Sequence, residues 1–309
     1  MPYDDLKADL RGVAFTNPTP FTEDATAVRH DALANNLEYI AEAGGNVILP
    51  CGNTGEYYSL SREERVAVVE TTVETVGDRM TVAGGVGGST KDACSLAEAY
   101  EEAGADALLV MHPVHTYVHA EGVAEYYRRL AEATDLGLVL YKRGPELPDR
   151  VIADLSSVDN VVAVKYAVND VKAFAALVRD TPGDIVFSNG IAERYGPSFG
   201  VEGAEGFTTG IGNFVPEASL ALMDAIRAED WDRAREIRDV FRPYEDLREE
   251  AGLGNDPALT AANNVPAVKF GMELAGLAGG PVREPIVGLS EADEARVREY
   301  YEALSGIER

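Results

Sequence analysis

The chain has 309 residues, 46% hydrophobic and 26% charged, which is the composition of an ordinary globular protein and enough for one large α/β barrel with an appendage. Its formal net charge of −26 would repel nucleic acids and anionic membranes, so we expect neither as a partner. Acidic residues spread along the whole chain and lysine is scarce, which favours a halophilic protein, with an acidic mesophilic protein as the alternative.

Eight short apolar runs alternate with amphipathic segments. Each run is rich in β-branched or aliphatic residues and is bounded by Gly, Pro or Asn, as is typical of buried parallel strands. The runs lie at 12–21, 46–52, 80–87, 107–113, 137–143, 161–167, 184–190 and 203–210.

The segment 61–77 illustrates how the intervening helices are encoded. Ser61 and Glu64 have the spacing of a capping box. An apolar stripe follows at intervals of three and four residues, formed by Val66, Val69, Val73 and Val76. Other helices are expected to end in an Ala-Gly step, because glycine adopts the left-handed cap conformation at little cost.

Strands that alternate with helices in this way predict an α/β fold, the (β/α)8 TIM barrel. A doubly wound open sheet is the alternative, but no GxGxxG opens the first helix. After residue 215 the pattern is helical. We predict a barrel over 1–230 and a C-terminal helical appendage over 231–309 that packs on it.

Cysteine and histidine give little sign of a disulfide framework or a metal site. The chain has two cysteines and no CxxC pair. His112, His115 and His119 stand close together, but they lack HExxH spacing and no further ligand precedes Glu121, so we expect no metal. The N-terminus has no apolar leader and no run reaches membrane length, so we expect a cytoplasmic protein.

Chemistry in a TIM barrel is expected at the carboxyl ends of the strands. Lys165 lies there within the apolar run VVAVKYA, in a chain with six lysines. Burial would favour its neutral amine, and a neutral amine attacks a ketone to form a Schiff base. The alternatives are a lysine paired with a buried carboxylate and a lysine that snorkels out at the strand end.

Two other strand ends carry candidate residues. Tyr141 ends the run GLVLY, where its phenol is suited to move protons at a reacting carbon; a core aromatic is the alternative. The turn GNTGE (52–56) offers backbone N–H groups and the Thr54 hydroxyl to an anion, although glycine-rich turns follow many strands.

In this order, the motifs GNTGE (52–56), LVLY (138–141) and VVAVKYAVND (161–170) resemble those of the dihydrodipicolinate synthase / N-acetylneuraminate lyase family. The resemblance covers nearly the whole chain. It implies a barrel with a C-terminal helical domain, usually a homotetramer, and a lysine that forms a Schiff base with a 2-keto acid. It makes Lys165 the Schiff-base residue, Tyr141 the proton shuttle, and Asn53 and Thr54 the seat of the substrate's α-carboxylate.

The motifs also discriminate among members of that family. The synthases of the lysine pathway carry Y-N-x-P-x-R-T, but here Glu146 stands at the arginine position, and His115 replaces a second tyrosine. The sugar-acid dehydratases, such as 5-keto-4-deoxyglucarate dehydratase, are more similar. The matching segments are YKR (141–143), GFTTGIGNFVP (206–216) and GPVREP (280–285), the last of which has no evident local chemistry.

The resemblance thus predicts a lyase that dehydrates a 2-keto-3-deoxy pentonate or hexarate to 2-oxoglutarate semialdehyde, with loss of CO2 from a hexarate. The imine is the electron sink, so no cofactor is expected. Arg143 is expected to bind distal substrate oxygens or else to form a surface salt bridge, Ser188 to contact substrate hydroxyls, and Glu56 to hold its turn. The alternatives are a 2-keto-3-deoxygluconate aldolase releasing pyruvate, a 4-hydroxy-tetrahydrodipicolinate synthase, and a non-catalytic sugar-acid sensor.

Overall fold

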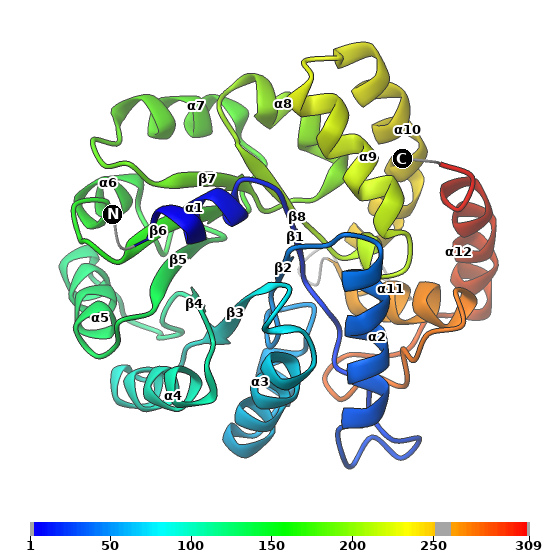
Figure 1. Cartoon of the computed structure of the whole chain (residues 1–309), viewed down its shortest axis with the longest axis horizontal. Helices are drawn as coiled ribbons and strands as arrows, with labels where there is room; N and C mark the ends of the chain where they lie inside the picture. Colours follow the sequence, from blue (N-terminus) through cyan, green and yellow to red (C-terminus); the bar gives the residue numbers. More distant parts are fainter. Residues whose placement is uncertain (1–2, 251–260, 308–309) are drawn as a thin grey trace.

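The computed structural model describes residues 3–250 and 261–307 and shows eight parallel strands closed into a barrel (Figure 1). Each strand pairs with its neighbours in the chain, and β1 pairs with β8 to complete the closure. This confirms the predicted TIM barrel and excludes the open sheet. The strands are β1 (Val13–Phe15), β2 (Val47–Ile48), β3 (Thr81–Val86), β4 (Ala107–Val110), β5 (Gly137–Lys142), β6 (Val161–Tyr166), β7 (Val186–Asn189) and β8 (Gly206–Thr209).

A ring of helices surrounds the barrel, one after each strand. The short helix α1 (Asp4–Leu10) precedes β1 and packs against β6 and β7 at the N-terminal opening (Figure 1). The ring helices are α2 (His30–Glu42), α3 (Arg62–Val76), α4 (Thr90–Ala103), α5 (Ala120–Glu132), α6 (Asp149–Leu155), α7 (Val171–Asp180), α8 (Gly196–Val201) and α9 (Pro216–Arg227).

Helix α3 begins with the predicted capping box, but its buried face matches the predicted apolar stripe only in part. The Ser61 hydroxyl accepts from the Glu64 N–H at 3.2 Å, and the Glu64 carboxylate accepts from the Ser61 N–H at 2.9 Å, which is the expected capping box. Val69 and Val76 are buried, but Val66 and Val73 are only partly buried. The buried face is completed by Val68 and Thr72, so it is rotated from the expected stripe.

Three further helices follow the barrel and lie together on one side of it (Figure 1). They are α10 (Trp231–Glu249), α11 (Asn264–Leu274) and α12 (Glu291–Leu304). Helix α10 packs against α9, and the barrel and the appended helices share one hydrophobic core. The expected domain boundary at residue 230 stays a prediction. Among the described residues, no helix is both long and apolar enough to cross a membrane.

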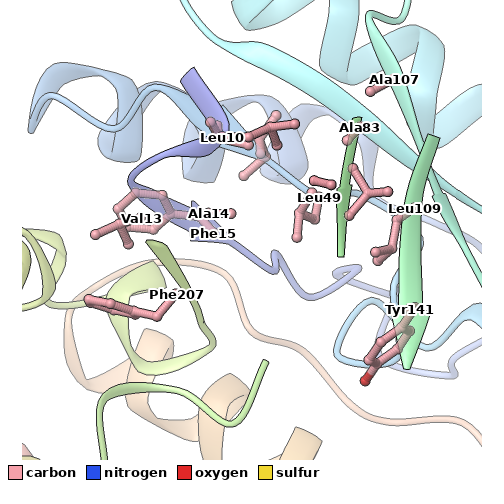
Figure 2. Close-up of a cluster of buried hydrophobic side chains, with 14 of the residues drawn as sticks. Leu10, Val13, Ala14, Phe15, Leu49, Ala83, Ala107, Leu109, Tyr141 and Phe207 are labelled. Carbon is pink, nitrogen blue, oxygen red and sulfur yellow. The ribbon is translucent and has the colours of Figure 1, made fainter. Parts of the chain in front are cut away.

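Strand register sets the position of the candidate side chains in the barrel. Tyr141 on β5 aligns with Lys165 on β6, and Lys165 aligns with Ser188 on β7. Aligned residues of parallel strands point to the same face, so these three side chains lie next to one another on the inner face of the barrel. Figure 2 shows Tyr141 at the edge of the aliphatic cluster that includes Leu49 and Leu109.

A glycine on β3 allows the turn after β2 to lie directly against the sheet. A Cβ on Gly85 would lie 1.9 Å from the carbonyl oxygen of Cys51, far inside contact distance. The Gly85 N–H donates to the Pro50 carbonyl at 2.8 Å, and Cys51 has a φ of 57°, in the left-handed region. Gly85 therefore fixes the depth at which the turn GNTGE begins.

We expect Gly85→Ala to lower the free energy of unfolding by about 1–3 kcal/mol, because the added methyl group overpacks the sheet against Cys51. The measurement is urea denaturation followed by circular dichroism. Gly122→Ala in α5 is the control: its Cβ would meet no atom within 4 Å, so it should stabilise the helix by up to about 1 kcal/mol. Equal stability of the two variants would contradict this view of the β2 turn.

Candidate active site

A pocket of about 690 Å³ lies where the carboxyl ends of the barrel strands meet the appended helices. Its wall includes five of the six predicted site residues, namely Asn53, Thr54, Tyr141, Arg143 and Lys165. The strands and turns that carry them are well separated in the sequence, and barrel closure brings them together. The pocket is therefore the candidate active site.

Lys165 is 5% exposed, although its amine reaches the pocket wall. The Nζ atom lies 4.4 Å from the centre of the Tyr141 ring. Burial, followed by the positive charges of Arg143 and Arg248, lowers the pKa of Lys165 to about 7. Within the described residues no carboxylate forms an ion pair with it. A large fraction of Lys165 is therefore the neutral amine at physiological pH.

Tyr141 is held beside this amine by the turn after β2. Its hydroxyl accepts a hydrogen bond from the Asn53 side-chain nitrogen at 3.2 Å. Burial raises the pKa of Tyr141, while the charge of Arg143 and the hydrogen bond from Asn53 oppose that shift. The phenol is thus protonated at rest, and the two opposing groups stabilise the phenolate that forms if the proton is given away.

Ser188 and Arg143, the two residues predicted to contact distal parts of the substrate, differ in their position relative to the pocket. Ser188 is buried and level with Lys165, but it does not line the pocket, and its hydroxyl has no hydrogen-bond partner among the described residues. Arg143 does line the pocket and is exposed. It forms no ion pair within residues 3–250 and 261–307, so the salt-bridge alternative is not seen there.

The residues at the two departures from the synthase motif lie outside the pocket. Glu146 is exposed and is not part of the pocket wall. His115 accepts a hydrogen bond from the Tyr117 N–H at 3.0 Å within its own loop.

His119 caps α5 by accepting from the Glu121 N–H at 3.3 Å. No cluster of three or more potential metal ligands occurs in the described part of the chain.

A buried ion pair secures the turn GNTGE to the appendage. The side chain of Glu56 is fully buried, and its Oε1 lies 2.5 Å from the Nζ of Lys269 on α11. Lys269 also donates to the Pro281 carbonyl at 2.6 Å. The second oxygen of Glu56 accepts from the Arg283 backbone N–H at 3.0 Å. Glu56 therefore holds its turn, as expected. Its partners, Lys269 and the Arg283 backbone, could not be identified from local sequence patterns.

The same contacts give the segment 280–286 a structural role. The Arg283 guanidinium binds both oxygens of Glu64 at 2.7 Å and lies 4.1 Å from the centre of the Phe21 ring. It also donates to the Ala25 and Ser59 carbonyls at 2.7 and 3.0 Å. Arg283 thus joins the C-terminal segment to the β1 loop, the β2 turn and the start of α3.

Sequence reasoning missed the residues that α10 and α11 contribute to the pocket, namely Glu245, Arg248, Glu249, Asn264 and Val265. A signal was present for two of them, because Glu245 and Arg248 share a helix face with the apolar residues Phe241 and Tyr244. A charged pair on an apolar face is uncommon, and it indicates a buried polar contact.

Comparison with known proteins places this geometry in a family. The model of the dihydrodipicolinate synthetase family matches residues 9–304. A 4-hydroxy-tetrahydrodipicolinate synthase of Methanothrix thermoacetophila is 30% identical, over 96% of this chain and 98% of its own. A protein of Ectopseudomonas mendocina named as a probable 5-dehydro-4-deoxyglucarate dehydratase is also 30% identical, over 93% and 92%. The crystal structure of dihydrodipicolinate synthase from Bacillus clausii superposes with a TM-score of 0.90, at 37% identity, and covers 96% of this chain and 99% of that one.

The buried ion pair of Glu56 with Lys269 predicts that replacing one partner destabilises the protein more than replacing both. Glu56→Gln or Lys269→Met should each lower the free energy of unfolding by about 3–5 kcal/mol, because each leaves a buried charge unpaired. The double variant should lose less than the sum of the two, as measured by urea denaturation of all four proteins. Simple additivity would contradict the pairing.

We expect Lys165→Met to stabilise the protein at low pH while it removes the amine. In the wild type the amine is protonated in both states below pH 7, so the cost of its buried charge is fully present there. That cost declines as pH rises from about 7, where the folded protein loses the proton, to about 10.5, where the unfolded chain does. The gain in melting temperature should therefore be larger at pH 6 than at pH 10. Lys172→Met, at an exposed lysine, is the control and should show no such trend.

Proposed function

The chain belongs to the dihydrodipicolinate synthetase family, whose members are Schiff-base-forming lyases, and we propose that it removes water from a 2-keto-3-deoxy sugar acid. Lys165 forms the imine in this proposal, and Tyr141 carries protons. Asn53 and Thr54 seat the substrate's α-carboxylate. The product of a pentonate is 2-oxoglutarate semialdehyde, and a hexarate gives the same product with loss of CO2.

The observation that carries the proposal is the contrast between Lys165 and the other two buried lysines. Lys142 lies 2.8 Å from an oxygen of Asp149, and Lys269 lies 2.5 Å from an oxygen of Glu56. Each of these amines forms an ion pair with a carboxylate. Burial lowers the pKa of Lys269, and Glu56 opposes that shift. Lys165 has no such partner among the described residues and faces a pocket large enough for a sugar acid. It is the buried lysine suited to nucleophilic attack.

In the proposed reaction these groups act in turn. The neutral amine of Lys165 attacks the C2 ketone, and Tyr141 protonates the departing hydroxyl as the iminium forms. The iminium acidifies C3, so the Tyr141 phenolate takes a C3 proton and yields an enamine. The enamine expels the C4 hydroxyl as water, with the proton returned by Tyr141. Tautomerisation and hydrolysis of the imine then release the product and restore the amine.

The dehydratase is favoured over the synthase by the residues after β5. The exposed Glu146 occupies the position of the synthase arginine and stands away from the pocket, whereas Arg143 lines it. A substrate carboxylate would meet Arg143 and not residue 146. The relatives named above include synthases at 30% and 37% identity and a probable dehydratase at 30%, so product analysis is required to separate the two activities.

Trapping of the imine tests the chemistry. We expect borohydride to reduce a covalent adduct of pyruvate or another 2-keto acid onto Lys165, detected by peptide mass mapping, with a rate that falls below about pH 7. Lys142 and Lys269 are internal controls and should stay unlabelled because their amines are ion-paired. The absence of an adduct at Lys165 would support a non-catalytic sensor and overturn the proposal.

Product analysis tests the reaction. Incubation with 2-keto-3-deoxy pentonates and hexarates should yield a semialdehyde and one water per turnover, with one CO2 in addition from a hexarate. A hexonate that loses water should give a six-carbon 2,5-diketone. Release of pyruvate from the same substrates would instead identify an aldolase. Consumption of aspartate semialdehyde together with pyruvate would identify a synthase.

A further inference from the structure

The appendage contributes a buried guanidinium to the active-site pocket. Arg248 lies in the last turn of α10, its residue is 5% exposed, and it lines the pocket together with Lys165 and Gly210. A Cβ on Gly210 would lie 2.7 Å from the Arg248 Nη2 atom, so the absence of a side chain directly after β8 makes room for the guanidinium. Arg248 therefore occupies a cradle built from both parts of the protein.

The hydrogen bonds of Arg248 leave part of its donor capacity unused. Its Nη1 donates to both oxygens of Glu245 at 3.0 Å, and its Nη2 donates to the Asn264 side-chain oxygen at 2.9 Å. Its Nε has no partner within the described residues. A guanidinium has five N–H donors, so at least one more acceptor can be accommodated.

The carboxyl group facing Arg248 does not fully cancel its charge. Burial raises the pKa of Glu245, and the neighbouring Glu193 raises it further, whereas Arg248 opposes the shift. Glu193 is itself fully buried and accepts a hydrogen bond from the Ser219 hydroxyl at 2.6 Å. Two buried carboxyls beside one guanidinium disfavour joint ionisation, so Glu245 is held back from full charge.

The other acidic residues of the pocket wall are each neutralised by a cation outside it. Glu56 is paired with Lys269, and Glu249 is 2.7 Å from Arg194. Arg143 has no ion pair within the described residues. Positive potential thus remains inside the pocket of a chain whose formal net charge is −26.

We propose that Arg248 and Arg143 form a second anion site in this pocket, which binds a distal carboxylate and selects a dicarboxylic 2-keto-3-deoxy sugar acid, a hexarate, over monocarboxylic substrates. The inference rests on the proposed Schiff-base chemistry and extends it to the substrate class. Arginine suits a carboxylate because its planar donors match two oxygens. The hydroxyl-bearing end of a monocarboxylic sugar acid would leave both guanidiniums without an anion.

A pair of matched 2-keto acids tests the site without turnover. 2-Oxoadipate and 2-oxohexanoate have six carbons each and differ only in the distal carboxylate. We expect the concentration for half-maximal borohydride trapping on Lys165 to be about 10–100-fold lower for 2-oxoadipate in the wild type. Among sugar acids, kcat/KM should favour the hexarate over the hexonate in the same direction.

Substitutions then assign the preference to the two arginines. Arg143→Gln, at an exposed residue without an ion pair among the described residues, should not impair folding and should reduce the preference at least fivefold, because trapping of 2-oxoadipate falls more than trapping of 2-oxohexanoate. Arg248→Gln should do the same, with folding checked by circular dichroism. Arg129→Gln, a distant surface change of the same charge, should keep the wild-type preference. Each active-site substitution should also move the low-pH limb of trapping to higher pH, because a charge that lowers the pKa of Lys165 is lost.

The outcomes separate this inference from the proposed function. Equal trapping of the two acids by the wild type, or equal losses for both acids in the variants, would overturn the second anion site and leave the imine chemistry standing. Absence of trapping with either acid would overturn the proposed function itself.

Discussion

A lysine amine that has no counter-ion among the described residues is the constraint on which the rest of the candidate site depends. Acidic residues outnumber basic ones by 53 to 27 in this chain, so a lysine would ordinarily find a carboxylate. Lys142 and Lys269 do so, and each amine lies within 2.8 Å of a carboxylate oxygen. Lys165 instead lies among apolar strand residues, with its nearest charged influences being two arginines that disfavour its protonation. Desolvation and like charge act in the same direction and lower the pKa of the amine to about 7, so much of it is neutral near physiological pH.

The barrel alone does not make this environment. The turn that carries Asn53 and Thr54 is fixed from below by the close approach of Cys51 to Gly85, and from outside by the ion pair of Glu56 with Lys269. The appendage is therefore part of the site, because it supplies Lys269 and the pocket-lining Arg248. The β/α repeat provides the position of the amine, and the three added helices provide the charges around it.

The charges around Lys165 also affect which substrates the pocket binds. An anionic substrate that approaches a protein with a net charge of −26 needs a local positive potential. Every acidic residue of the pocket wall is matched by a cation or held back from ionisation, whereas Arg143 and Lys165 are unpaired within the described residues. When a substrate carboxylate neutralises an arginine, the repulsion that lowers the pKa of Lys165 also diminishes. Binding and the protonation state of the amine are in this way coupled through the field of the two guanidiniums.

The sequence by itself determined the eight strands, the capping box of α3 and five residues of the pocket wall, because strand periodicity and strand-end position are local properties. It also marked Glu56 as a residue that holds its turn. Only the tertiary structure decided that Lys165 has no carboxylate partner in the part of the chain that the structure describes, that Ser188 lies off the pocket wall, and that Arg248, Lys269 and Arg283 connect the appendage to the β2 turn and the pocket. These features depend on the packing of distant segments, such as Glu56 and Arg283, which are 227 residues apart in the chain. Local patterns do not encode which distant charges meet, since that depends on how the closed barrel and its added helices pack together.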